Sequence, residues 1–199
     1  MNPYAQGGWS NAYNPNAVNS QPSGTSPLYG ALPYPTPSST APTFLTFIFT
    51  PLDGTILNSL VMGPQSKTYF RINTDSISSG FSIIQNPTLE SVALIEWRSH
   101  PIVEIRNIVS KRSTSQLLAL SSDNTHRVME LRGKKFRWTP SEGYIRLYST
   151  GVPNPQLFGR ISQGQNGVVL EVTTEAVHIG LLEVCITSAL LLMSGRNID

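Results

Sequence analysis

Cysteine and charge are both scarce in this chain of 199 residues. Its one cysteine, Cys185, excludes an internal disulfide framework and favours a reducing compartment. Only 13% of the residues are charged and the formal net charge is +2, so acidic partners are permitted but not required. The N-terminus has no basic start followed by an apolar segment, and Asn-x-Ser/Thr acceptors with a permitted middle residue are missing. These absences predict a cytoplasmic or nuclear protein.

Residues 1–42 contain no Lys, Arg, Asp, Glu or His. They are instead dense in Pro, Asn, Ser and Tyr, with few branched aliphatic side chains. Such a segment cannot bury enough apolar surface to offset the roughly 1 to 2 kcal/mol per residue that ordering a backbone costs. We therefore expect a disordered tail. Its spaced aromatic residues leave open a second role, in which the tail self-associates weakly or is bound by a proline-reading partner.

Signatures of catalysis and metal binding are missing as well. The QGQNG segment, 163–167, lacks the Lys-Ser/Thr end of a phosphate-binding loop and precedes a strand instead of a helix. His178 and Cys185, seven residues apart on a helix, would be separated by about 10 Å along its axis, too far for a nucleophile and its base. No paired carboxylates or metal ligands stand at a functional spacing. The sequence predicts a protein that is not an enzyme and that holds no metal or cofactor.

Composition changes abruptly at Thr43, where we place the start of a folded domain over 43–199. The first segment, TFLTFIFT, is aromatic and branched and is stopped by Pro51, which is typical of a strand. Ten further segments between Gly-Pro, Asn-Pro and Asn-Gly turns have a similar character: 56–62, 68–73, 80–85, 91–98, 102–109, 127–131, 135–139, 144–149, 156–162 and 168–173. Residues 115–120 fit either a short helix or a loop. Short strands at regular spacing predict a mainly β (β-rich α+β) protein with an antiparallel sandwich or barrel.

The most hydrophobic segment is 176–193, AVHIGLLEVCITSALLLM, which we expect to be a helix. It is apolar almost all round, so it belongs in a protein core or a bilayer. Gly180 and Glu183 shorten its uninterrupted apolar part well below the ~20 residues that span a membrane. We therefore place the helix in the core, with no integral membrane span, and Glu183 as a structural residue near its start. A closed antiparallel β-barrel around this central C-terminal helix would bury every face of it.

Several segments, taken in order, resemble the tubby C-terminal and phospholipid-scramblase-like superfamily, most closely an uncharacterised fungal domain family within it. The resembling segments are LTF at 45–47, ALIEWRS at 93–99, FRW at 136–138 and LEVTTEAVHIGLLEVCITSALLLM at 170–193. The resemblance covers about 43–196. It implies the same barrel around a helix and no established reaction. Relatives with this fold are known as phosphoinositide-binding, membrane-associated or transcription-linked proteins, but neither a lipid-site motif nor the scramblase calcium-binding segment is matched here.

The segment RGKKFRW, 132–138, is the main surface candidate. In a hairpin that turns at Gly133, alternation sends Phe136 and Trp138 inward, and Lys135 and Arg137 outward. With Arg127 on the preceding strand, five basic side chains would gather into a small cationic lip. The candidate anion-binding residues are Arg127, Arg132, Lys134, Lys135 and Arg137.

Such a lip would bind phosphates, since each basic residue contributes about 1 kcal/mol near an anionic membrane surface. Nucleic acid is the less favoured source of phosphate. A plainer interpretation is that these residues are solvated and limit aggregation. The leading hypothesis is a non-enzymatic intracellular binding module, peripheral to a membrane at most, that engages anionic phospholipid or another acidic partner. Three alternatives stay open: a tail-anchored membrane protein with 180–193 inserted, a hydrolytic enzyme with a site at the barrel mouth, and a protein–protein scaffold acting through the N-terminal tail. The ligand and the oligomeric state are also left open.

Overall fold

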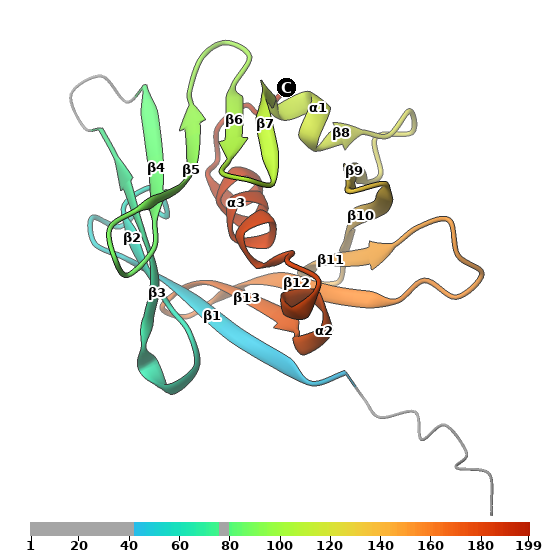
Figure 1. Cartoon of the computed structure of the whole chain (residues 1–199), viewed down its shortest axis with the longest axis horizontal. Helices are drawn as coiled ribbons and strands as arrows, with labels where there is room; N and C mark the ends of the chain where they lie inside the picture. The colour runs from blue at the N-terminus through green and yellow to red at the C-terminus, as the bar shows by residue number, and fades with distance from the viewer. Residues whose placement is uncertain (1–41, 76–79) are drawn as a thin grey trace, which may run out of the picture. The chain divides into compact units, whose positions relative to one another are not determined.

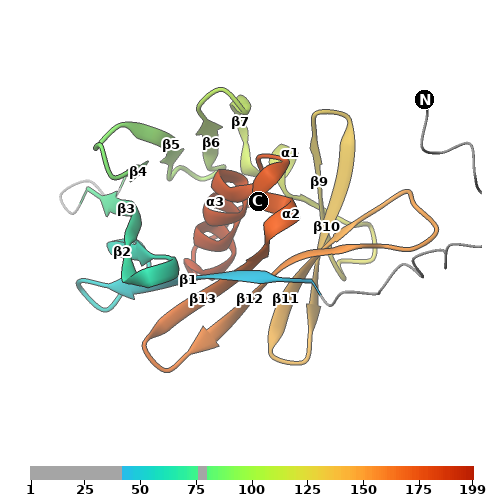
Figure 2. The same ribbon diagram turned by 60° about the horizontal axis from the view of Figure 1, so that its bottom comes forward.

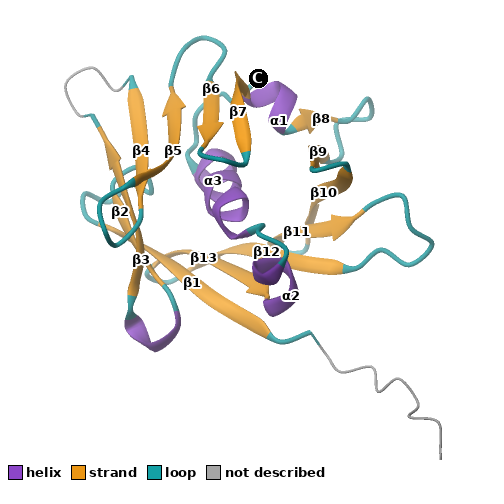
Figure 3. Ribbon diagram, viewed as in Figure 1, coloured by secondary structure: helices purple, strands orange, loops and turns teal. Residues whose placement is uncertain are grey.

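The computed structural model of this chain describes residues 42–75 and 80–199 (Figure 1). The tail expected to be disordered, 1–42, lies outside the described residues except for its last position. The described part is mainly β, as the sequence predicted, with only short helical segments besides one longer helix (Figure 3).

The elements follow one another in chain order. The first half contains β1 (Phe44–Pro51), β2 (Ser59–Met62), the 3₁₀ turn η2 (Pro64–Ser66), β3 (Thr68–Thr74), β4 (Phe81–Gln85), β5 (Ser91–Glu96), β6 (Ile102–Ile105) and β7 (Val109–Ser113). The second half contains α1 (Thr114–Leu117), β8 (Ala119–Leu120), β9 (Arg127–Leu131), β10 (Lys134–Ser141), β11 (Tyr144–Ser149), β12 (Leu157–Gly164), β13 (Gly167–Thr173), α2 (Thr174–His178) and α3 (Leu182–Met193).

Thirteen strands of the described residues form one antiparallel sheet with the order β7-β6-β5-β4-β3-β2-β1-β13-β12-β11-β10-β9-β8. The chain therefore makes two meanders that meet where the first strand pairs with the last. There, Phe44 lies opposite Thr173 and Phe49 opposite Val168. The prediction of a large antiparallel sheet is confirmed.

Within the described residues, the two end strands β7 and β8 are not hydrogen-bonded to each other. The helix α1 lies between them (Figure 1). The Thr114 hydroxyl at its start bonds to the carbonyl of Ile198, so the C-terminal segment packs beside this helix. Closure of the barrel by hydrogen bonds, which the sequence predicts, stays a prediction.

The helix α3 lies at the centre of the curved sheet, with strands on successive sides in both views (Figures 1 and 2). All residues from Val184 to Leu191 are buried, although a one-sided amphipathic helix would expose residues on its polar face in every turn. The polar Thr187 is satisfied inside the helix, because its hydroxyl donates to the carbonyl of Glu183 at 2.7 Å. This arrangement explains why an apolar helix occurs in a strand-rich chain. Among the described residues, no helix has the length and apolar character needed to cross a membrane.

The hydrophobic segment 176–193 forms two helices, and the expectation of one continuous helix is wrong. The helix α2 is capped by the Thr173 hydroxyl, which accepts from the amide of Ala176 at 3.1 Å. Gly180 then adopts φ +78°, which ends the first helix and redirects the chain before Leu182. Glu183 lies in the first turn of α3, as expected for a carboxylate that favours the positive end of a helix dipole.

The expected strand 102–109 is also divided. Asn107 has φ +61°, and the amide of Ile108 bonds back to the carbonyl of Ile105 at 3.0 Å, which makes a tight turn. The following polar segment, Val109–Ser113, then forms β7, which the sequence did not predict because its alternation is weak. The undecided segment 115–120 contains the end of α1 and the short strand β8.

The burial of Cys185 leads to a testable prediction. Its side chain is fully buried in α3, and burial raises the pKa of the thiol to about 12. At pH 8 the thiol is therefore protonated and shielded, so we expect labelling by a thiol reagent to be roughly 100-fold or more slower in native buffer than in denaturant. Rapid stoichiometric labelling of the folded protein would contradict the placement of α3 inside the sheet.

Candidate anion-binding site

The hairpin of β9 and β10 positions the basic residues that the sequence singled out. Its two turn residues, Arg132 and Gly133, have φ of +49° and +73°, a pair of left-handed conformations typical of two-residue hairpin turns. In β10, Phe136 and Trp138 are 2% and 1% exposed. The inward and outward alternation that the sequence predicted is present here.

Arg127 does not belong to the proposed cationic lip. It lies at the opposite end of β9 from the turn, where its guanidinium donates to both carboxylate oxygens of Asp199, at 2.7 and 2.6 Å. It also donates to the carbonyl of Leu118 at 2.9 Å. The bonds from Arg127 lower the pKa of Asp199, so this carboxylate stays ionised and neutralises the arginine. The role of Arg127 is structural, because it connects the C-terminal segment to the sheet.

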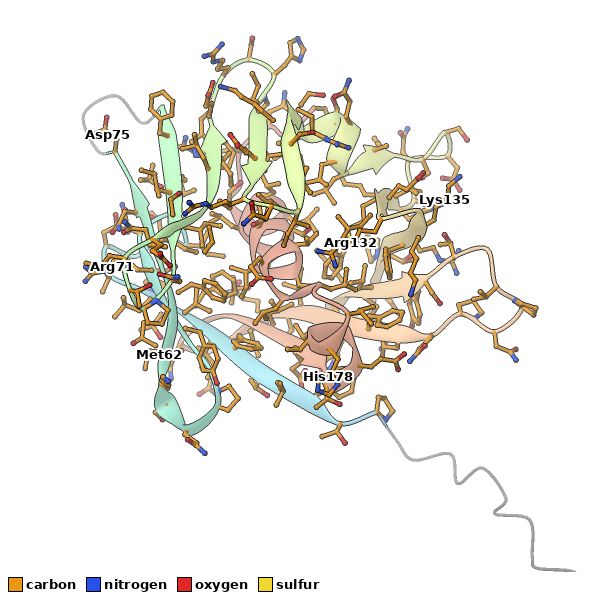
Figure 4. All side chains as sticks on the ribbon, in the orientation of Figure 1. Met62, Arg71, Asp75, Arg132, Lys135 and His178 are labelled. Carbon is orange, nitrogen blue, oxygen red and sulfur yellow. The ribbon has the colours of Figure 1, made fainter. Side chains whose placement is uncertain are left out.

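Arg132 and Arg137 lie apart from the two lysines. Arg132 points toward the turn between α2 and α3, since a Cβ added at Gly180 would lie 3.5 Å from the Nη1 atom of Arg132. In Figure 4, Arg132 and Lys135 lie on different sides of the hairpin. Arg137 is half-buried on the outer face of β10, opposite Tyr148. Within the described residues its Nε atom is buried without a hydrogen-bond partner. Of the five predicted residues, the structure brings only Lys134 and Lys135 together on one cavity.

That cavity is a groove of about 620 Å³ beside the hairpin turn. Lys134 and Lys135, both exposed, line it at the start of β10. The loop from Ser149 to Gln156 and the helix α2 form the other sides. We call this space, lined by the hairpin end, the 149–156 loop and α2, the hairpin groove.

The floor of the hairpin groove is aromatic. Phe136 of β10 and Phe158 of β12 meet edge to face, with ring centroids 5.5 Å apart. Across from the lysines, the carboxylate of Glu175 accepts a hydrogen bond from the side-chain amide of Gln156. Ile179, which follows α2, completes this wall. The groove therefore combines an apolar floor with one basic and one acidic rim.

The floor and the acidic rim were missed at the sequence level. Phe158, Glu175 and Ile179 come from segments more than twenty residues after the lysines, so nothing local connects them to RGKK. Only the pairing of β10 with β11 and of β11 with β12 brings these segments side by side.

A second group of arginines on the outer face of the sheet was also missed. Arg146 of β11 lies directly opposite Arg160 of β12. Arg160 donates to both carboxylate oxygens of Glu171, at 2.5 and 2.9 Å, and this bonding raises the pKa of Arg160. Arg146 and Arg160 both stack over the ring of Tyr144, at 5.6 and 5.0 Å. The alternating YIRLY segment was the signal that would have placed Arg146 outward.

No family model matches this sequence, and no curated protein matches it. Among solved structures, the chain is similar to an X-ray structure of a protein from Arabidopsis thaliana. The identity is 14% over 74% of this chain and 93% of the plant protein, with a TM-score of 0.43. A likeness of that size assigns neither family nor function. The resemblance to the tubby and scramblase superfamily therefore stays a prediction.

Two other features of the described residues bear on chemistry. Glu183, half-buried in the first turn of the central helix, lines a cavity of about 400 Å³ together with Glu90 and Arg106. Over residues 42–75 and 80–199, no group of three His, Cys, Asp or Glu side chains is placed to hold a metal ion.

Proposed function

We propose that this domain is a non-enzymatic binding module, inside the cell, that engages anionic phospholipid through the turn of the β9–β10 hairpin. The observation that supports it is the placement of Lys134 and Lys135, which are both exposed and both line the hairpin groove. Arg132 is exposed as well but points toward the α2–α3 turn, apart from the lysines, so it is not counted with them. Arg127 is left out, because Asp199 neutralises it.

The two lysines give a modest attraction. At about 1 kcal/mol per basic residue near an anionic surface, they supply about 2 kcal/mol, which raises binding roughly 30-fold over a neutral surface. Because the side chains are exposed, salt screens this attraction. The module would therefore bind anionic membranes reversibly and in a salt-dependent manner.

Co-sedimentation of the full chain with vesicles tests this function. We expect binding to vesicles that contain phosphatidylserine or phosphoinositide, weaker binding in high salt, and little binding to neutral vesicles. The double variant Lys134→Ala/Lys135→Ala removes two cations and is expected to lower binding about 30-fold.

The matched control is Lys67→Ala/Arg71→Ala, which removes the same charge from exposed positions on and beside β3. Figure 4 shows Arg71 far from Lys135, across the domain. This variant is expected to retain most of the binding. Equal losses in the two variants would mean that net charge alone drives binding, and would overturn the assignment to the hairpin.

Insertion of 180–193 into a bilayer, one of the alternatives, would require the folded domain to open. The segment from Val184 to Leu191 packs in the core of the domain, so insertion would expose the inner face of the sheet. A full chain that stays in solution without detergent would count against insertion. The scaffold alternative depends on the tail, which lies outside the described residues.

A further inference from the structure

We propose that the hairpin groove binds a single-chain amphiphile with a phosphate head, of the monoalkyl or monoacyl phosphate class. The head would lie on Lys134 and Lys135, and the chain along the floor made by Phe136 and Phe158. This inference rests on the proposed function, because it uses the same two lysines, and it adds the class of ligand.

A phosphate ion alone would not account for the apolar side chains that line the groove. The edge-to-face pair Phe136 and Phe158 forms its floor, and Ile179 lies beside it. Val152, on the loop that closes the groove, is 48% exposed. Val152 and Ile179 are the accessible apolar side chains that an alkyl chain would cover, and the nearly buried rings of Phe136 and Phe158, 2% and 5% exposed, lie beneath them. A hydrated headgroup bound only at the rim would leave Val152 and Ile179 in contact with water.

The size of the groove also fits an entire small molecule. Its volume of about 620 Å³ lies within the roughly 300 to 1,000 Å³ typical of pockets that enclose a small ligand. Such pockets have mainly apolar walls and a few polar groups that orient the ligand, which is the arrangement of the floor and the two lysines.

Charge sets the direction of the ligand. Lys134 and Lys135 line the hairpin side, whereas Glu175 lies on the α2 side and is held by Gln156. A phosphate is attracted to the lysines and repelled by the carboxylate, so the head is placed at the hairpin and the chain leads away from it. Replacement of the carboxylate by its neutral isostere, Glu175→Gln, is expected to tighten binding of an alkyl phosphate by about twofold to fivefold.

Isothermal titration of the full chain with inorganic phosphate, butyl phosphate and octyl phosphate, all below micelle-forming concentrations, tests the class of ligand. Each buried methylene is worth up to about fourfold in affinity, so octyl phosphate is expected to bind at least tenfold more tightly than butyl phosphate. Lys134→Ala/Lys135→Ala should weaken both alkyl phosphates.

The variant Val152→Ser, at the rim of the groove, distinguishes the contribution of the alkyl chain to affinity from that of the phosphate head. It is expected to reduce the preference for octyl over butyl phosphate at least threefold and to leave butyl phosphate unchanged. Leu52→Ser is the control, because Leu52 is 58% exposed and is not among the residues that line the groove. The same variants with anionic vesicles identify the source of the ligand. Weaker vesicle binding by Val152→Ser means that the chain is taken from a bilayer, and unchanged vesicle binding means that the ligand is a free monomer.

The outcomes distinguish this inference from the proposed function. Equal affinities for butyl and octyl phosphate would overturn the amphiphile, while lysine-dependent binding to anionic vesicles would still support the module. Affinities for butyl and octyl phosphate that do not fall in Lys134→Ala/Lys135→Ala would overturn the assigned head position. Failure of both alkyl phosphates and anionic vesicles to bind would reject the two proposals together.

Discussion

Leu190→Ala is expected to lower the free energy of unfolding by about 2 to 5 kcal/mol. Leu190 is fully buried in α3, at the centre of the sheet, and belongs to the main hydrophobic core. Its truncation removes apolar contacts and leaves a cavity, because helix and strands on all sides prevent the surroundings from closing over it. Urea denaturation followed by circular dichroism measures the loss as a lower midpoint at an unchanged slope.

Leu52→Ala is the matched control for this substitution. The chemical change is the same, but Leu52 is 58% exposed, so the expected change in unfolding free energy is within about 0.5 kcal/mol. Similar losses in the two variants would mean that α3 is not enclosed by the sheet. A large loss in Leu190→Ala alone supports the central position of the helix.

Gly167→Ala is the second substitution with a large expected effect, about 2 to 4 kcal/mol of destabilisation. Gly167 begins β13 with φ +132°, a conformation that side chains with a Cβ rarely adopt. An added Cβ would lie 2.2 Å from the carbonyl oxygen of Phe49 in β1, and this neighbour is backbone that cannot rotate away. The strain therefore falls on the pairing of the first strand with the last, and urea denaturation again measures it.

Gly54→Ala separates conformational strain from the clash. Gly54 also has a positive φ, +84°, but no atom lies within 4 Å of an added Cβ. We expect it to lose only about 1 kcal/mol, the strain of a left-handed backbone. If Gly54→Ala and Gly167→Ala lower the free energy of unfolding by the same amount, β1 can move to accommodate a Cβ at position 167. The junction of the two meanders would then be less tightly packed than the structure indicates.

Most strands were readable from the sequence because their signals are local. β1, with Phe47 and Phe49 inward and Ile48 outward, follows simple alternation between two turn-forming segments. The segment Val109–Ser113 was missed, since its polar residues become a strand only through pairing with β6. The break in the C-terminal segment was missed for a related reason. Gly180 inside an apolar segment is compatible with a continuous helix, and tertiary packing selected the left-handed conformation instead.

The candidate site was predicted in part. The lysine pair was found because RGKK at a hairpin turn places charges outward by a local rule. Arg127 was assigned wrongly to that group, because its partner Asp199 is 72 residues away in the sequence and only the folded chain brings them together. Phe158 and Glu175 were not predicted as site residues for the same reason.

By itself, the sequence determined the class of this protein: a β-rich domain, an apolar helix that must be buried, and a basic hairpin turn. Each follows from residues within one segment, since alternation, turn chemistry and burial of apolar side chains act over short distances. The tertiary structure decided which of those features share a site. The pairing of β10, β11 and β12 carries Phe158 next to Phe136, and α2 brings Glu175 opposite the lysines. Contacts of this kind depend on strand order and register, which no single segment encodes.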